Sequence, residues 1–148
     1  MPISFDQRLA LLQRMSRGWL DLKKGISGLR PGELGAPLCP GCWTGRDLIV
    51  HIAICDEELT GRLLELDEGE LGVAPVPDNE SNDVSSEQRV EEYRNLSAAD
   101  AFDYFEQAHF DLMEVLERSP SVTAALIEPA VAHYQEHLEQ VTQRSRRR

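Results

Sequence analysis

The sequence has few cysteines and few aromatic residues, and it lacks any long apolar run. Three cysteines in 148 residues are an odd count, and no basic N-terminal region leads into an apolar stretch. We therefore expect a cytoplasmic protein without structural disulfides. No apolar segment approaches the roughly 20 residues that span a bilayer, which argues against a membrane partner.

Positive charge is also scarce. Lys and Arg number 15 against 26 Asp and Glu, which gives a formal net charge of −11. Four of the basic residues are gathered in a C-terminal tail at Arg144, Arg146, Arg147 and Arg148. An acidic body repels a phosphate backbone, so we expect no nucleic-acid partner and interpret residues 144–148 as a solvated basic tail. The length fits one domain over residues 1–148.

Apolar residues recur every three or four positions in four stretches, which is the period of an amphipathic helix. The first predicted helix covers residues 5–26 and ends at Ser27-Gly28, and the second begins at Thr44, a favourable N-cap, and runs to about residue 66. The connection between them, rich in Pro and Gly, is expected to be ordered but without a regular element.

A third helical region is predicted over residues 87–118, interrupted near residues 95–97, where Ser97 offers a new N-cap. The fourth helix follows Ser119-Pro120-Ser121, with Pro129 expected in its first turn. Residues 67–86 are acidic and rich in Gly, Pro, Asn and Ser, which predicts a long crossover between helices two and three. With no strand pattern or internal repeat, the fold class is all-α, a four-helix bundle.

Three histidines are candidate metal ligands. His133 and His137 are four residues apart on the fourth predicted helix and therefore share one face. His51 lies beside the apolar stripe of the second helix, where a charged imidazole would be costly and a metal-bound neutral one would not. Spacing alone also fits histidines at a helix surface. If the three meet, a tetrahedral or octahedral ion keeps open positions, as catalytic sites do.

Residues 133–137 also match H-x-x-E-H, a zinc motif of certain metalloproteases, with Glu136 in the position of the base. Those enzymes take a third ligand far downstream, whereas only eleven residues follow His137, so we reject that interpretation. Glu136 is expected to be a solvated residue, with a role as proton acceptor as the alternative. His109 is left outside the predicted site.

The segment Trp43-Thr44-Gly45-Arg46-Asp47-Leu48-Ile49-Val50-His51-Ile52 resembles the W-[ST]-x-x-D-x-x-x-H-[IL] segment of the DinB-like superfamily of metal-binding four-helix bundles. In that resemblance, His133 and His137 match the H-x-x-x-H of the last helix, and His51 matches the third ligand. Residues 78–97 are similar to the D-x-x-x-N crossover and following helix of the actinobacterial, mycothiol-dependent maleylpyruvate isomerase-like branch.

This resemblance implies a DinB-like bundle that binds a divalent metal ion, zinc or nickel, and that forms a homodimer. It also implies a small-molecule substrate. Some relatives are thiol-dependent S-transferases or isomerases that use a low-molecular-weight thiol as co-substrate, and others are hydrolases. No individual catalytic residue is assigned by the resemblance.

The cysteines have their own interpretations. Cys39 and Cys42 form a C-x-x-C just before the tryptophan, and we expect incidental loop cysteines there, with a redox pair or a zinc ligand set as alternatives. Cys55 follows His51 by one helical turn and is expected to be a small core residue rather than a fourth ligand.

Three hypotheses for function follow. In the leading one, an ion held by His51, His133 and His137 activates a thiol or water for attack on a small electrophile. In the second, the protein is a non-catalytic binding module with a structural ion. In the third, Cys39 and Cys42 form a thiol redox switch.

Overall fold

The computed structural model describes residues 3–69 and 87–146. Four long helices make up most of this part: α1 (Phe5–Ser27), α3 (Gly45–Asp67), α5 (Ala98–Arg118) and α6 (Ala124–Arg146). A short helix, α2 (Pro31–Leu34), follows α1, and residues 87–92 are also helical. Within the described residues the only extended pairing is an isolated bridge between Pro37 and Thr44. The predicted all-α class is confirmed.

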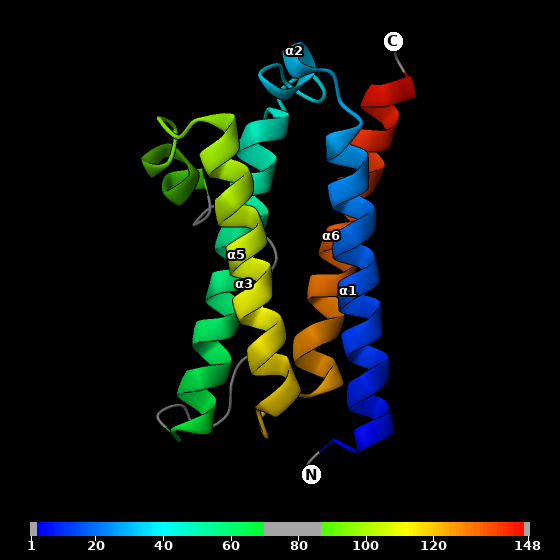
Figure 1. Ribbon diagram of the computed structural model, residues 1–148, viewed down its shortest axis with the longest axis vertical. Helices are drawn as coiled ribbons and strands as arrows, with labels where there is room; N and C mark the ends of the chain where they lie inside the picture. Colours follow the sequence, from blue (N-terminus) through cyan, green and yellow to red (C-terminus); the bar gives the residue numbers. More distant parts are fainter. Residues whose placement is uncertain (1–2, 70–86, 147–148) are drawn as a thin grey trace.

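The long helices are arranged as two pairs. The helix α3 packs along α5, and α1 packs along α6, whereas contacts between the two pairs are less extensive (Figure 1). The two seams between the pairs therefore lie where α1 meets α5 and where α3 meets α6. In helical bundles, ligand and metal sites are built from side chains on facing helices, as at these two seams.

The helix starts follow the N-caps expected from the sequence. The Thr44 hydroxyl accepts a hydrogen bond of 3.0 Å from the Asp47 amide and so satisfies one of the free N–H groups at the start of α3. The Ser97 hydroxyl does the same for Asp100 at the start of α5, at 3.1 Å. The predicted break before residue 98 is thus confirmed, with the cap as its cause.

The core is formed by apolar side chains from all four long helices. Its largest fully buried members include Met15, Leu22, Ile26, Leu48, Ile49, Ile52, Phe105, Leu112, Leu116 and Tyr134. At roughly 1.5–3 kcal/mol for each buried large side chain, this core is what stabilises the bundle. No helix in the described ranges is long and apolar enough to cross a membrane.

Two expectations about local structure are wrong. The connection after α1 contains the short helix α2, because Pro31 occupies its first position, where a missing N–H costs nothing, and the Glu33 side chain accepts a hydrogen bond of 3.0 Å from the Arg30 amide. The helix α6 begins at Ala124, so Pro129 lies inside it rather than in its first turn. The apolar residues Leu126 and Ile127 are buried in this first turn, which explains the earlier start.

The expectation of no disulfide is also wrong, because Cys39 and Cys42 are disulfide-bonded. Pro40 and Gly41 are the central residues of a turn in which the Cys42 amide donates 2.9 Å to the Cys39 carbonyl oxygen. Gly41 adopts a φ of 76°, which glycine tolerates and other residues avoid. The turn brings the two Cα atoms to 5.1 Å, within the range that a disulfide needs.

The predicted crossover between the second and third long helices falls largely on residues 70–86, which lie outside the described residues, as does the end of the basic tail at residues 147–148. The D-x-x-x-N part of the family resemblance lies in the same undescribed segment. The chain order of the four long helices nevertheless agrees with the predicted bundle.

Candidate metal centre

The three predicted histidines come together at the seam between α3 and α6. His51 lies on α3 and is fully buried, and His133 and His137 lie one turn apart on α6. The Nε2 atom of His133 is 3.0 Å from Nε2 of His51 and 2.9 Å from Nε2 of His137. The His133 nitrogen thus lies between those of His51 and His137, and it joins positions 82 residues apart in the chain, His51 and His133.

Hydrogen bonding cannot account for both short contacts. A ring nitrogen of an imidazole carries either one proton or one lone pair in the ring plane, so the His133 Nε2 atom can form one such hydrogen bond and not two. A cation that accepted all three lone pairs would satisfy both contacts. Two nitrogens that each lie about 2.0–2.1 Å from one zinc-like ion are roughly 2.8–3.4 Å apart, depending on the angle. The observed separations fall in that range.

A hydrogen bond fixes the tautomer of His137. Its Nδ1 atom lies 2.9 Å from the side-chain oxygen of Gln140, which can only accept, so Nδ1–H donates and Nε2 keeps its lone pair for the shared point. Metal-binding histidines are commonly oriented in this way, by a partner on the ring nitrogen that does not face the ion.

Electrostatics keep the cluster uncharged. Burial, followed by the proximity of His133 and His137, lowers the pKa of His51 to about 2. Burial, followed by the proximity of His137, lowers the pKa of His133 to about 4. Both rings are therefore neutral near pH 7, which is the form that binds a metal ion.

The residues of the tryptophan motif position His51. The Trp43 ring packs against the His51 ring, with 4.3 Å between centroids. Asp47 pairs with Arg46 at 3.0 Å, and the Arg46 guanidinium also donates to the backbone oxygens of Tyr93 and Leu96, at 2.6 and 2.7 Å. These bonds attach the start of α3 to the segment before α5. The motif thus fixes the end of the helix that carries His51.

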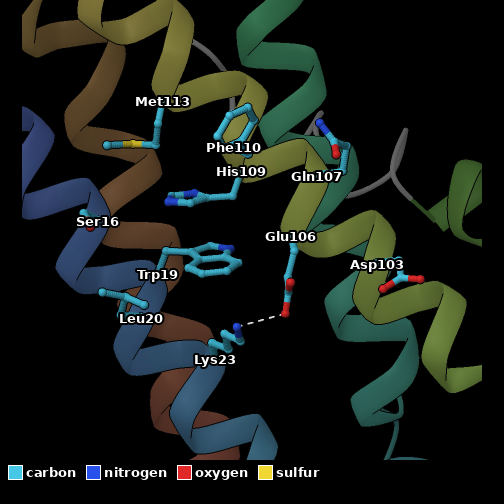
Figure 2. A pocket seen from close by; sticks show the side chains of 10 residues that line it. All are labelled: Ser16, Trp19, Leu20, Lys23, Asp103, Glu106, Gln107, His109, Phe110 and Met113. Atoms are coloured by element: carbon cyan, nitrogen blue, oxygen red, sulfur yellow. Dashed lines mark ion pairs between the residues drawn. The ribbon is translucent and has the colours of Figure 1, made fainter.

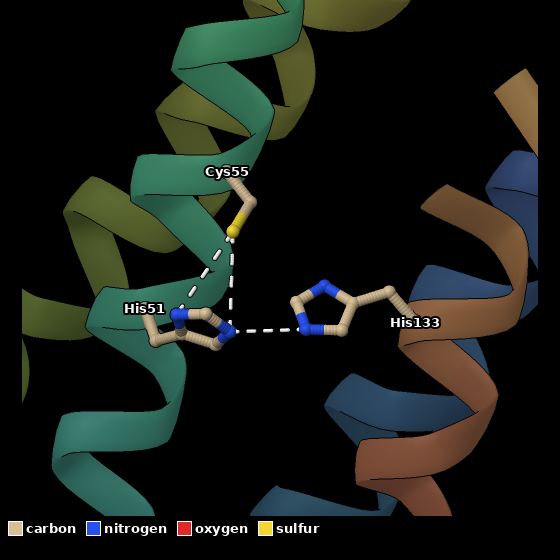
Figure 3. A group of neighbouring side chains, drawn as sticks. All are labelled: His51, Cys55 and His133. Atoms are coloured by element: carbon tan, nitrogen blue, oxygen red, sulfur yellow. Dashed lines mark hydrogen bonds between the residues drawn. The ribbon is translucent and has the colours of Figure 1, made fainter. Parts of the chain in front are cut away.

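Cys55 also belongs to this cluster (Figure 3). Its sulfur lies 3.9 Å from both ring nitrogens of His51. Ligand atoms of His51, Cys55 and His133 all lie within 4.8 Å of one another. Cys55 is half-buried and is placed beside the imidazoles, whereas the sequence suggested a small residue of the core.

The remaining candidates lie elsewhere. Glu136 is exposed on α6. His109 is on α5, at a groove of about 630 Å³ between α1 and α5 that is also lined by Trp19 and Phe110 (Figure 2). The His109 ring stacks on Trp19, with centroids 4.2 Å apart and planes at 5°. The cluster of His51, His133 and His137 lies instead on the seam between α3 and α6.

Sequence reasoning missed a buried polar group behind the histidines. Asp56 is fully buried on α3, and its Oδ1 atom accepts a hydrogen bond of 2.6 Å from the Tyr134 hydroxyl. Its Oδ2 atom is 3.6 Å from Nδ1 of His109, too far for a hydrogen bond. Burial raises the pKa of the Asp56 carboxyl, and the contacts with His109 and Tyr134 oppose that shift. The sequence did contain a sign of this group: Asp56 follows Ile52 by one helical turn, which places a carboxylate on the apolar face of α3.

A solved structure has the same arrangement of helices. YfiT from Bacillus subtilis, described as a probable metal-dependent hydrolase with an unusual four-helix bundle topology, aligns with a TM-score of 0.70 over 98% of this chain and 89% of that one. The two proteins share a fold. Their sequences are 19% identical, so the likeness extends to the fold alone. No family model and no curated protein matches this sequence.

Proposed function

We propose that His51, His133 and His137 hold a divalent metal ion, zinc or nickel, and that the protein is a metal-dependent enzyme of the DinB-like superfamily. One observation carries this proposal: the Nε2 atom of His133 lies 3.0 Å from Nε2 of His51 and 2.9 Å from Nε2 of His137, two contacts that hydrogen bonding alone does not satisfy. The fold shared with YfiT and the motif around Trp43 support the superfamily. Membership in its mycothiol-dependent branch stays a prediction.

The chain's own residues determine what the centre can do. Three neutral imidazoles bring no negative charge of their own, so an ion that they hold stays positively charged and lowers the pKa of a bound water or thiol. Burial of His51 and contact with Trp43 exclude water from one side of the cluster. His133 is half-buried and leaves the other side accessible. A small electrophile would approach from there.

Hydrolysis is the reaction we place first, because the structural neighbour YfiT is described as a probable metal-dependent hydrolase. Attack by a low-molecular-weight thiol on a small electrophile is the second reaction, motivated by the family resemblance. The two differ only in the nucleophile, since both need the same ion and an accessible coordination position.

The first experiment measures metal content. Elemental analysis of the purified protein should give about one equivalent of a divalent transition metal. His51→Gln and His137→Gln should each lose at least about tenfold in affinity, since they remove ligands. His109→Gln is the matched control, with a histidine removed from α5, and should keep the metal. Metal retained by both ligand variants at wild-type affinity would contradict the proposal.

The second experiment measures turnover. The metal-loaded protein is assayed against a panel of esters and amides without thiol, and against a panel of small electrophiles with a low-molecular-weight thiol. Activity in the first panel supports a hydrolase, and activity that requires thiol supports a transferase. A correctly loaded protein inactive in both panels, and whose His51→Gln variant only loses thermal stability, would indicate a non-catalytic binding module.

A further inference from the structure

Each of the two helices at the seam carries a pair of metal-binding residue types one turn apart. On α6 the pair is His133 and His137, and on α3 it is His51 and Cys55. Residues four apart on a helix point to the same side, and Figure 3 shows His51 and Cys55 of α3 facing His133 of α6. His137 lies one turn further along α6, with its Nε2 atom 2.9 Å from that of His133. The cluster therefore contains four groups that can bind one ion, three imidazoles and one thiol.

The sulfur is close enough to join the histidines. A sulfur and a nitrogen that share one ion, at about 2.3 Å and 2.0–2.1 Å from it, are roughly 3.1–3.6 Å apart. The Cys55 sulfur is 3.9 Å from Nε2 of His51. The same sulfur is also 3.9 Å from Nδ1 of His51, and the ligand atoms of His51, Cys55 and His133 lie within 4.8 Å of one another. The half-buried side chain of Cys55 must therefore rotate about its Cα–Cβ bond to bring the sulfur to the Nε2 side of the ring.

We propose that Cys55 is a fourth protein ligand of the ion held by His51, His133 and His137. This inference rests on the proposed function, because it needs the ion. A coordinating thiol is deprotonated by the ion, so Cys55 adds one negative charge next to three neutral rings. The added charge lowers the net charge of the centre. It also makes the site softer, which favours zinc or cobalt over magnesium and manganese.

A thiolate ligand also changes how the enzyme is controlled. With four protein ligands, an ion must either expand its coordination or release Cys55 to bind substrate. A small thiol that binds the ion in place of Cys55 provides the same kind of ligand, a thiolate sulfur. Cys55 is thus a determinant of metal choice and of access to the ion.

Cobalt(II) provides a direct test, because a thiolate bound to cobalt gives a sulfur-to-metal charge-transfer band in the near ultraviolet that imidazole ligands lack. The metal-free protein is titrated with cobalt(II) alone. The wild type should show the band, and Cys55→Ser should lose it while still binding cobalt(II), at least about tenfold more weakly. A Cys39→Ser, Cys42→Ser double variant is the matched control and should keep the band.

A second measurement follows the thiol itself. Cys55 should react with a thiol-specific reagent in the metal-free protein, and zinc should slow this reaction by at least about tenfold. In His51→Gln, zinc should give little protection. Cobalt(II) bound by the wild type without a charge-transfer band, and with no protection of the thiol, would overturn the role of Cys55 and leave the histidine site standing. A wild-type protein that binds no metal would overturn both proposals.

Discussion

Acidification of the metal-free protein should destabilise it through the buried histidines. The pKa of His51 is about 2 and that of His133 about 4 in the folded protein, against 6.5 when the ring is solvated. Below pH 6.5, His51 and His133 become protonated in the unfolded chain but stay neutral in the folded protein. Stability is therefore highest above pH 6.5 and falls as the pH decreases, down to about pH 4 for His133 and about pH 2 for His51.

The size of the loss follows from the same values. At pH 5, which is about 1.5 units below the pKa of a solvated histidine, protonation of each ring stabilises the unfolded state by ~2 kcal/mol, at 1.36 kcal/mol per unit. His51 and His133 together should therefore lower the free energy of unfolding by ~4 kcal/mol between pH 7 and pH 5. This is a large share of the roughly 5–15 kcal/mol typical of a domain.

The assay is urea unfolding of chelator-treated protein at several pH values between 5 and 7.5, for the wild type and for His51→Gln. The variant should lose about 2 kcal/mol less than the wild type between pH 7 and pH 5, because one titrating ring is absent. Asp56, whose raised pKa acts in the opposite direction, is present in both proteins and cancels in the difference. An equal loss in the two proteins would refute the reasoning.

Two further predictions concern the framework of the site. Tyr134→Phe removes the hydroxyl that donates 2.6 Å to the buried Asp56 and should cost about 1–3 kcal/mol in urea unfolding; a change below ~0.5 kcal/mol would mean that the carboxyl does not need this donor. Thr44→Ala removes the N-cap of α3 and should cost about 1 kcal/mol, whereas Thr44→Ser should be nearly neutral; equal stability of Ala and Ser would contradict a capping role.

Much of this arrangement could be predicted because the signals are local. The cap at Thr44 and the interruption before residue 98 depend on side chains that bond to their own backbone. The pair His133 and His137 needs only helical spacing. The meeting of His51 with them requires the packing of α3 near α6, and there the motif around Trp43 provided the information that spacing lacked.

The errors arise where distant parts of the chain decide the outcome. Pro129 on its own is typical of a first helical turn, but the burial of Leu126 and Ile127 against the core extends α6 back to Ala124. The role of Asp56 was missed because a carboxylate in an apolar stripe is explained only by its partner, Tyr134, which lies 78 residues further on. The disulfide was missed on grounds of cellular location, although the turn at Pro40-Gly41 indicates that the two cysteines are close.

The division of the bundle into two helix pairs gives the histidine cluster a mechanical meaning. His51 belongs to the α3–α5 pair, and His133 and His137 belong to the α1–α6 pair. A cation bound there, as we propose, would link the two helix pairs, and its binding energy would also favour their docking. The affinity for the ion would therefore depend on how the two helix pairs pack together.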